Sequence, residues 1–160
     1  MKSMRAGCFA LCFTILAAVP AMAANKAVNL SLFTPISLAK AEDSITALRL
    51  NLIYGKNASV KIIDLGLVNQ TTTLSSGLQW GVVNYNEGNM SGLQLAAVNY
   101  NMGSTKGLQV ATVNYAENAG GLQFAFVNYA RQLNGFQLGA INIASQGGMF
   151  PVMVIANWKK

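Results

Sequence analysis

A repeat of 14 or 15 residues fills most of the sequence and constrains its fold more than any other feature. Five copies read Gly-Leu-Gln-x-x-x-Val-Asn with minor changes. Their first residues are Gly77, Gly92, Gly107, Gly121 and Gly135. Two degenerate copies precede them, at 47–54 and 62–69, so the array holds about seven units. A short fixed period is the signature of an architecture in which equivalent units stack on one another.

The side chains within each unit alternate as they do along a β-strand. After the glycine, the first and third residues are large and apolar, the second is polar and the fourth is small. Such a period of two predicts a strand with one buried face. Burial of about three large side chains would contribute roughly 5–8 kcal/mol. Ordering a single unit costs roughly 20 kcal/mol, so the units must stack to be stable.

We predict that the units stack as an all-β solenoid with coils of 14–15 residues and divergent capping strands. Equivalent polar residues would then form ladders along the stack. The glutamine ladder would comprise Gln79, Gln94, Gln109, Gln123 and Gln137. The asparagine ladder would comprise Asn84, Asn99, Asn114, Asn128 and Asn142. Arg49 and Asp64 occupy the glutamine position of the degenerate units, where they would be complementary neighbours.

The alternative architecture is an antiparallel β-meander, open or closed into a small outer-membrane β-barrel. Its large apolar side chains would face lipid and its glutamines would fill a narrow lumen. Two observations favour the solenoid. Successive linkers look alike, although a meander would place them alternately at opposite ends. The motif is also only eight or nine residues long, whereas a membrane strand needs about 9–11.

The N-terminus predicts export. Lys2 and Arg5 precede an uncharged apolar run at 6–20, and Ala21-Met22-Ala23 forms a small-x-small cleavage site. This order is typical of a secretory signal peptide. We therefore expect a cleaved signal at 1–23, an N-terminal cap at 24–46, tandem repeats at 47–144 and a C-terminal capping strand at 145–160. The expected location is the periplasm, the outer membrane or the cell surface.

The residue inventory removes most enzymatic chemistry. The sequence contains no histidine, and both cysteines, Cys8 and Cys12, would leave with the signal peptide. The common nucleophile–base pairs and most transition-metal sites are therefore not expected. We predict no enzyme activity, no catalytic residues, no metal site and no cofactor.

Charge in the repeat block is sparse and balanced. Residues 77–144 carry only Glu87, Lys106, Glu117 and Arg131. Nucleic-acid binding requires clustered lysine and arginine, so a nucleic-acid partner is not expected. Glu87 and Glu117 lie in equivalent linkers, two coils or roughly 10 Å apart. We expect both to be solvated charges without a partner that shifts either pKa.

A tyrosine recurs in register directly after the asparagine of four units. These residues are Tyr85, Tyr100, Tyr115 and Tyr129. Beside an amide ladder they form a candidate ligand face for glycans, through ring–sugar contacts and hydrogen bonds. The favoured interpretation is structural, with the rings packed on the edge of the core and the hydroxyls at the surface.

With these residues in view, the chain resembles the bacterial exported surface-repeat proteins, the leptospiral-type family with Gly-Leu-Gln-x-Gly-x-Val-Asn units. Residues 48–57 and 64–69 look like the usual opening of such proteins. The resemblance covers residues 48–157 and implies an exported, envelope-associated protein without implying an activity. Alanine is more frequent than glycine at the fourth position here, which is a mild departure from the pattern.

The leading functional hypothesis is a non-enzymatic structural or interaction protein of the cell envelope. One alternative is a small outer-membrane β-barrel protein. Another is a carbohydrate-binding or adhesive module that uses the tyrosines and the amide ladders. The expected partners are envelope components, the outer membrane or surface glycans, and the sequence does not predict an oligomeric state.

Overall fold

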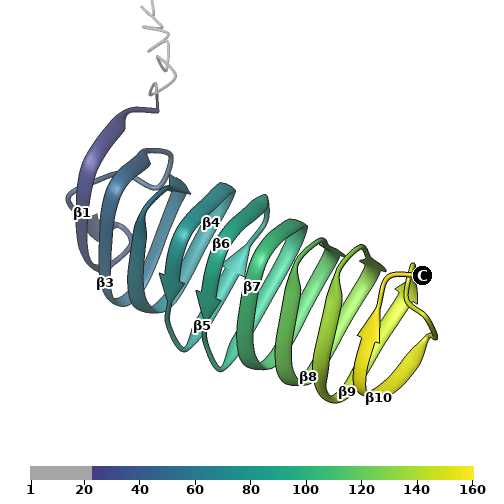
Figure 1. Cartoon of the computed structure of the whole chain (residues 1–160). Helices are drawn as coiled ribbons and strands as arrows, with labels where there is room; N and C mark the ends of the chain where they lie inside the picture. The colour runs from purple at the N-terminus through teal and green to yellow at the C-terminus, as the bar shows by residue number, and fades with distance from the viewer. Residues whose placement is uncertain (1–22) are drawn as a thin grey trace, which may run out of the picture.

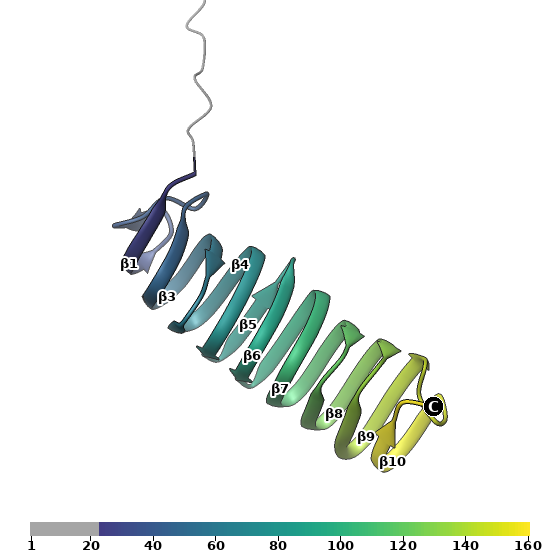
Figure 2. The same cartoon turned by 45° about the horizontal axis from the view of Figure 1, so that its top comes forward.

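The computed structural model describes residues 23–160, which wind into an elongated β-solenoid (Figures 1 and 2). Successive coils lie side by side along one axis, with β1 at one end and β10 at the other. The predicted fold class is confirmed, and no helix occurs within 23–160. Apart from Ala23, the expected signal peptide lies outside the described residues.

Ten strands make up the solenoid. In chain order they are β1 (Asn25–Phe33), β2 (Ile36–Ser37), β3 (Ser44–Val60), β4 (Ile63–Trp80), β5 (Val83–Asn86), β6 (Asn89–Leu95), β7 (Val98–Ala119), β8 (Leu122–Leu133), β9 (Phe136–Gln146) and β10 (Val152–Trp158). Pairing from β1 through β9 is parallel, and only β2 and β10 pair antiparallel with their neighbours. The longer strands follow the chain around a corner of the coil.

The strands pair in register, one whole unit apart. Gln94 lies beside Gln109, and Asn99 is preceded in the stack by Asn84. Parallel in-register pairing of this kind defines a solenoid and is incompatible with successive hairpins. The antiparallel meander, open or closed on itself, is therefore not the fold of these residues.

The two amide ladders run through the interior of the coils, which corrects our expectation that the large apolar residues supply the buried surface. The glutamines and asparagines of the two ladders are at most 2% exposed, whereas Trp80 is 60% and Phe126 is 64% exposed. The physical reason is that equivalent amides one coil apart can satisfy each other's hydrogen bonds along the stack. Alternation shows which residues share a face of a strand, but it does not show which face lies inside.

The first glycine of the repeat is required by the close approach of the preceding coil. Gly92 has φ +124°, in the region that side chains rarely adopt. A Cβ atom there would lie 2.2 Å from the carbonyl oxygen of Gly77 in the preceding coil. The glycines therefore allow adjacent coils to approach to the spacing that the ladders need.

The N-terminal end is closed by a loop that Asp43 holds. Its carboxylate accepts hydrogen bonds from the backbone N–H groups of Ala24 (2.9 Å) and Lys40 (3.0 Å). The bond from Ala24 is the main reason that the pKa of Asp43 is lowered. Strand β1 stacks parallel on β3 and places Asn29 beside Arg49, so regular stacking already begins within the segment expected as a cap.

Candidate functional site

The glutamine column consists of Arg49, Asp64 and the five repeat glutamines. The hydrogen bonds between the five glutamines all run in one direction. Each Nε2 donates to the Oε1 of the glutamine one coil earlier. The donor–acceptor distances are 2.7 Å for Gln94, 3.0 Å for Gln109, 3.0 Å for Gln123 and 2.8 Å for Gln137. Gln79 ends the chain of amides by donating to Oδ2 of Asp64 at 2.8 Å.

A buried ion pair anchors this direction. Arg49 donates from Nε and Nη2 to the two oxygens of Asp64, both at 2.7 Å, and its side chain is completely buried. An ionised carboxylate can only accept hydrogen bonds, so Gln79 must present its NH₂ group to Asp64. That choice leaves Oε1 of Gln79 as the acceptor for the next glutamine, and the same orientation propagates to Gln137.

The asparagine column runs in the opposite direction. Nδ2 of Asn51 donates to Oδ1 of Asn69 at 2.8 Å, and the same bond recurs coil by coil as far as Asn142. Backbone carbonyls fix this orientation, since Nδ2 of Asn99 also donates to the oxygen of Val110 at 3.2 Å. The amides of the two columns thus bond mainly to one another inside the coils, and among them the oxygens without a partner are Oδ1 of Asn51 and Oε1 of Gln137, at the ends of the columns.

The four register tyrosines stack face to face on the outside of the coils. Ring centroids are separated by 5.5 Å between Tyr85 and Tyr100, 4.4 Å between Tyr100 and Tyr115, and 5.0 Å between Tyr115 and Tyr129. Each ring face within the stack is therefore covered by the next ring. Stacking of a sugar on a tyrosine requires a free ring face. In this stack the neighbouring tyrosines cover every ring face except the two at its ends.

Glu117 is not the unpartnered linker charge that we expected. It accepts a hydrogen bond from the hydroxyl of Tyr115 at 2.7 Å and forms an ion pair with Arg131. The hydrogen bond from Tyr115, and after it the contact with Arg131, lower the pKa of Glu117. The same hydrogen bond raises the pKa of Tyr115 to about 12. This ion pair could have been predicted by aligning the linkers, because Glu117 and Arg131 occupy equivalent positions 14 residues apart.

An apolar surface follows the outside of the coils and bends at residues 81–82 and 96–97, and we call it the apolar face. It is formed by the first, third, fifth and sixth residues after the glycine of each unit. The third-position column contains Leu50, Leu65, Trp80, Leu95, Val110, Phe124 and Leu138. The fifth-position column contains Leu52, Leu67, Val82, Ala97, Thr112, Phe126 and Ala140. Leucine, isoleucine, valine and Phe136 fill the other two columns, so the face contains no charged residue.

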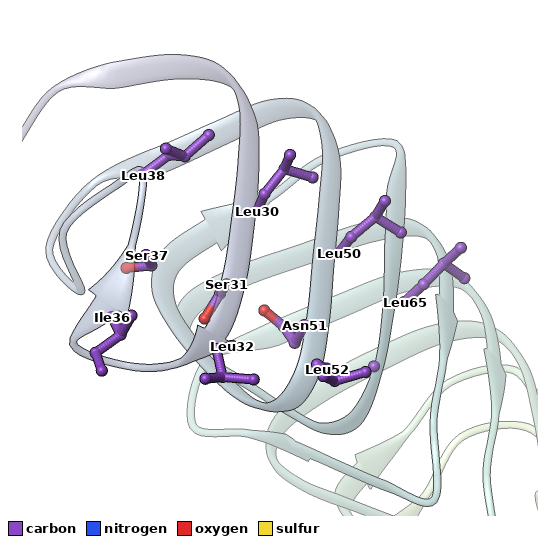
Figure 3. A pocket seen from close by; sticks show the side chains of 11 residues that line it. Leu30, Ser31, Leu32, Ile36, Ser37, Leu38, Leu50, Asn51, Leu52 and Leu65 are labelled. Atoms are coloured by element: carbon purple, nitrogen blue, oxygen red, sulfur yellow. The ribbon is translucent and has the colours of Figure 1, made fainter.

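The apolar face continues over the N-terminal coil into a hollow of about 740 Å³. Leu30, Leu50 and Leu65 form one row across successive coils, and Leu32 and Leu52 form a second (Figure 3). Ile36 and Leu38, on and beside the short strand β2, form the wall at the end of the solenoid. This hollow was not predicted, because β2 brings residues outside the repeat against the first coils.

Residues 23–160 contain no group of three or more histidine, cysteine, aspartate or glutamate side chains placed to hold a metal ion. The same residues contain no helix of the length and apolarity needed to cross a membrane.

Comparison with known proteins gives no match to a family model, a curated protein or a solved structure. The resemblance to exported surface-repeat proteins therefore remains a prediction that rests on the repeat motif. The apolar face, the N-terminal hollow and the internal ladders are the features on which a functional argument can be built.

Proposed function

We propose that the protein is an exported, non-enzymatic structural or interaction protein of the cell envelope. The observation that carries this proposal is the contrast between the two sides of each strand. The amide side chains of the repeats are consumed by bonds inside the coils, and the outer surface offers apolar area. A large exposed apolar patch is typical of a protein that acts by binding another surface.

The distribution of the carboxylates supports the same proposal. Asp64 is held by Arg49, Asp43 by two backbone N–H groups, and Glu117 by Tyr115 and Arg131. Each of these three is therefore engaged in the structure, while Glu42 and Glu87 are exposed. A carboxylate pair for general acid–base catalysis is therefore not expected among residues 23–160. The signal-like N-terminus supports delivery to the envelope.

Fractionation of cells that express the full chain with a C-terminal tag tests the proposal. We expect a product that has lost residues 1–23 and is recovered with the envelope or periplasm. The matched control is Leu16→Arg, which interrupts the apolar run and should retain the uncleaved chain in the cytoplasm. Recovery of the unsubstituted chain in the cytoplasm with its N-terminus intact would refute the proposal.

A further inference from the structure

We propose that a trough at the N-terminal end of the solenoid binds one long-chain fatty acid, with its carboxylate beside Lys40 and the end of its acyl chain beside Trp80. The trough consists of the N-terminal hollow and of the part of the apolar face that continues it as far as Trp80. The inference goes beyond the proposed function, because it names a ligand and does not depend on where the protein is located.

The trough runs along the axis of the solenoid between two rows of apolar side chains. Its floor consists of residues that are small or turn inward, since Asn51 donates its side-chain amide to Asn69 inside the coil. Figure 3 shows the part of both rows nearest the N-terminus, with Ser31 and Asn51 between them. One row contains Leu38, Leu30, Leu50, Leu65 and Trp80, the other contains Ile36, Leu32, Leu52, Leu67 and Val82, and the floor contains Ser37, Ser31, Asn51, Gly66 and Gly81.

Two hollows make this trough continuous over five levels of the stack. The hollow of about 740 Å³ covers the levels of β2, β1, β3 and the first part of β4. A second hollow of about 330 Å³ shares Leu65 and Gly66 with it and extends to Trp80 and Val82. Four steps at about 4.8 Å give a length of roughly 19 Å. An extended hydrocarbon chain has C–C bonds of about 1.5 Å and advances ~1.25 Å per carbon, so ~15 carbons span the trough.

The trough offers few free hydrogen-bonding groups, which favours a hydrocarbon chain over a peptide. Strand β3 pairs with β1 on one side and with β4 on the other, so the backbone groups of the floor are used in the sheet. The hydroxyl of Ser31 donates to the carbonyl of Tyr54, and that of Ser37 donates to the carbonyl of Ala39. A peptide would bring its own N–H and C=O groups without partners, at a cost that a chain of methylenes does not incur.

The trough has room for a single chain and ends inside the array. The two rows are two residues apart along each strand, or roughly 7 Å, which accommodates one hydrocarbon chain between them. Beyond Val82 the second row continues with Ala97 and Thr112, whose side chains are too short to form a wall. The bend of the coil at 81–82 lies at the same level. This change separates the trough from the rest of the apolar face and sets where the acyl chain ends.

A polar hollow adjoins the N-terminal end of the trough. It has a volume of about 490 Å³, it shares Ser37 and Leu38 with the trough, and it is also lined by Thr34 and Lys40. Lys56 borders the same hollow, because its backbone N–H donates to the hydroxyl of Thr34 at 2.9 Å. An amphiphile that lies in the trough therefore places its head among these polar groups.

The charges around the polar hollow are complementary to an anionic head. Two lysines, Lys40 and Lys56, accompany one exposed carboxylate, that of Glu42. The carboxylate of Asp43 is turned inward, where it accepts hydrogen bonds from the backbone N–H groups of Ala24 and Lys40. The residues that line the far end of the trough are all uncharged. A largely apolar site with a few placed polar groups at one end is typical of a small-molecule pocket and orients the fatty acid.

Trp80 serves as the reporter of binding. The chain has two tryptophans, so Trp158→Phe leaves Trp80 as the only one. The full chain of this variant is expressed, and its purified product is titrated with palmitate below the micellar concentration. We expect the Trp80 emission to shift to shorter wavelength and to saturate at one palmitate per chain, with a micromolar dissociation constant. Hexadecyltrimethylammonium, a cationic amphiphile of the same chain length, should bind at least tenfold more weakly.

Brominated palmitates test the orientation, because bromine quenches tryptophan on contact. Palmitate brominated at its terminal carbon should quench Trp80 strongly, and palmitate brominated beside the carboxylate should quench it little. The double variant Lys40→Gln/Lys56→Gln should lose most of the preference for palmitate over the cationic amphiphile. Lys106→Gln, in the linker of a later coil, is the control and should keep that preference.

A matched pair of substitutions on the apolar face tests the position of the site. Leu52→Asp, in the trough, should weaken palmitate binding at least tenfold. Phe126→Asp, outside the trough, should leave it unchanged, although the two side chains are similarly exposed, at 66% and 64%. Circular dichroism confirms folding in every variant.

Four outcomes would overturn the proposal. They are an emission that palmitate does not change, equal binding of the anionic and cationic amphiphiles, stronger quenching by bromine beside the carboxylate, and equal weakening by Leu52→Asp and Phe126→Asp. Phosphatidylglycerol vesicles that shift the Trp80 emission where palmitate does not would identify a membrane surface as the occupant instead.

Discussion

The interior of the solenoid differs between its N-terminal and C-terminal coils. Beside the glutamine column, the earlier coils place Asn86 and Asn101, and both exchange hydrogen bonds with glutamines. The later coils place Ala116, Ala130 and Ala144 at the equivalent position, where these alanines form a small apolar cluster with Ala119 and Leu133. The same backbone therefore encloses a polar network at one end and methyl groups at the other.

The change in the interior coincides with a change in coil length. Units beginning at Gly77 and Gly92 contain 15 residues, whereas those beginning at Gly107 and Gly121 contain 14. A coil with one residue fewer has a shorter perimeter and encloses less space, which alanine fills without a polar group to satisfy. Coil length and interior chemistry are thus linked, although the glutamine and asparagine columns continue through both regions.

Removing Asp64 should produce the largest effect, because only the N-terminal region contains a buried charge pair. Asp64→Ala leaves the Arg49 guanidinium unpaired and Nε2 of Gln79 without its acceptor. We expect the free energy of unfolding to fall by about 3–5 kcal/mol, measured by urea denaturation followed by circular dichroism.

The control for this substitution converts both charged members of the column to the residue of the later units. The double variant Arg49→Gln/Asp64→Gln restores a continuous amide ladder and should recover most of the lost stability. A double variant that is as unstable as Asp64→Ala would show that the ladder does not tolerate glutamine in these coils.

Substitution of equivalent glutamines should separate the two regions directly. Gln94 bonds to Gln79, Gln109 and Asn101, whereas Gln123 bonds only to Gln109 and Gln137. Gln94→Met should lower the free energy of unfolding by about 3 kcal/mol, because it leaves donors on two neighbours without an acceptor. Gln123→Met should lower it by about 1 kcal/mol. Equal losses in urea unfolding would contradict the distinction between a polar and an apolar region.

Exchanging the residue that differs between the two regions, asparagine for alanine, should have a smaller effect on stability. Ala116→Asn adds a polar side chain to a 14-residue coil and should destabilise the protein by about 1–3 kcal/mol through overpacking. The reciprocal change, Asn101→Ala, removes a partner of Gln94 and serves as the comparison. A neutral Ala116→Asn in thermal unfolding would show that coil length does not limit the interior.

The smallest predicted effect concerns the linker contacts of the C-terminal region. Because its hydrogen bond to Glu117 raises the pKa of Tyr115 from 10.0 to about 12, the folded state holds the phenol proton more tightly than the unfolded state. The contribution of Tyr115 to stability is therefore complete below pH 10 and is lost as the pH rises through about 12.

Tyrosinate absorbance checks this contact. Glu117→Gln should move the Tyr115 ionisation back toward 10, because the acceptor is no longer charged. Arg131→Gln is the matched control, since it removes the other partner of Glu117 and leaves the tyrosine hydrogen bond in place. An ionisation profile that Glu117→Gln does not change would show that this bond does not control the tyrosine.

The sequence predicted the architecture well because its strongest signal was the period itself. Equal spacing of Gln94 and Gln109 predicts parallel in-register neighbours, and the structure places them so. The Arg49–Asp64 pair was also readable, because complementary charges occupy one aligned position. Both predictions require only knowing which residues are equivalent, and aligning the repeat units shows this directly.

The direction in which side chains point was less predictable. Apolar residues occur at odd positions of the units and also at even positions, such as Val83 and Tyr85. This was the sign in the sequence that large side chains also lie outside. Hydrophobicity favours burial in most domains, but here a stack of amides fills the narrow interior and displaces larger residues outward. The hollow beside Leu38 depends on the path of a non-repeated segment, and no period predicts that path.

The ladders make the length of this molecule a quantity that changes in whole steps. Each amide bond joins equivalent atoms one coil apart, so duplicating an entire unit such as 92–106 recreates every donor and acceptor with the same polarity. Such a duplication would lengthen the outer surface by one rise of about 4.8 Å and leave both end structures intact. Gene duplication within the array can therefore lengthen the protein by whole coils without requiring a new core.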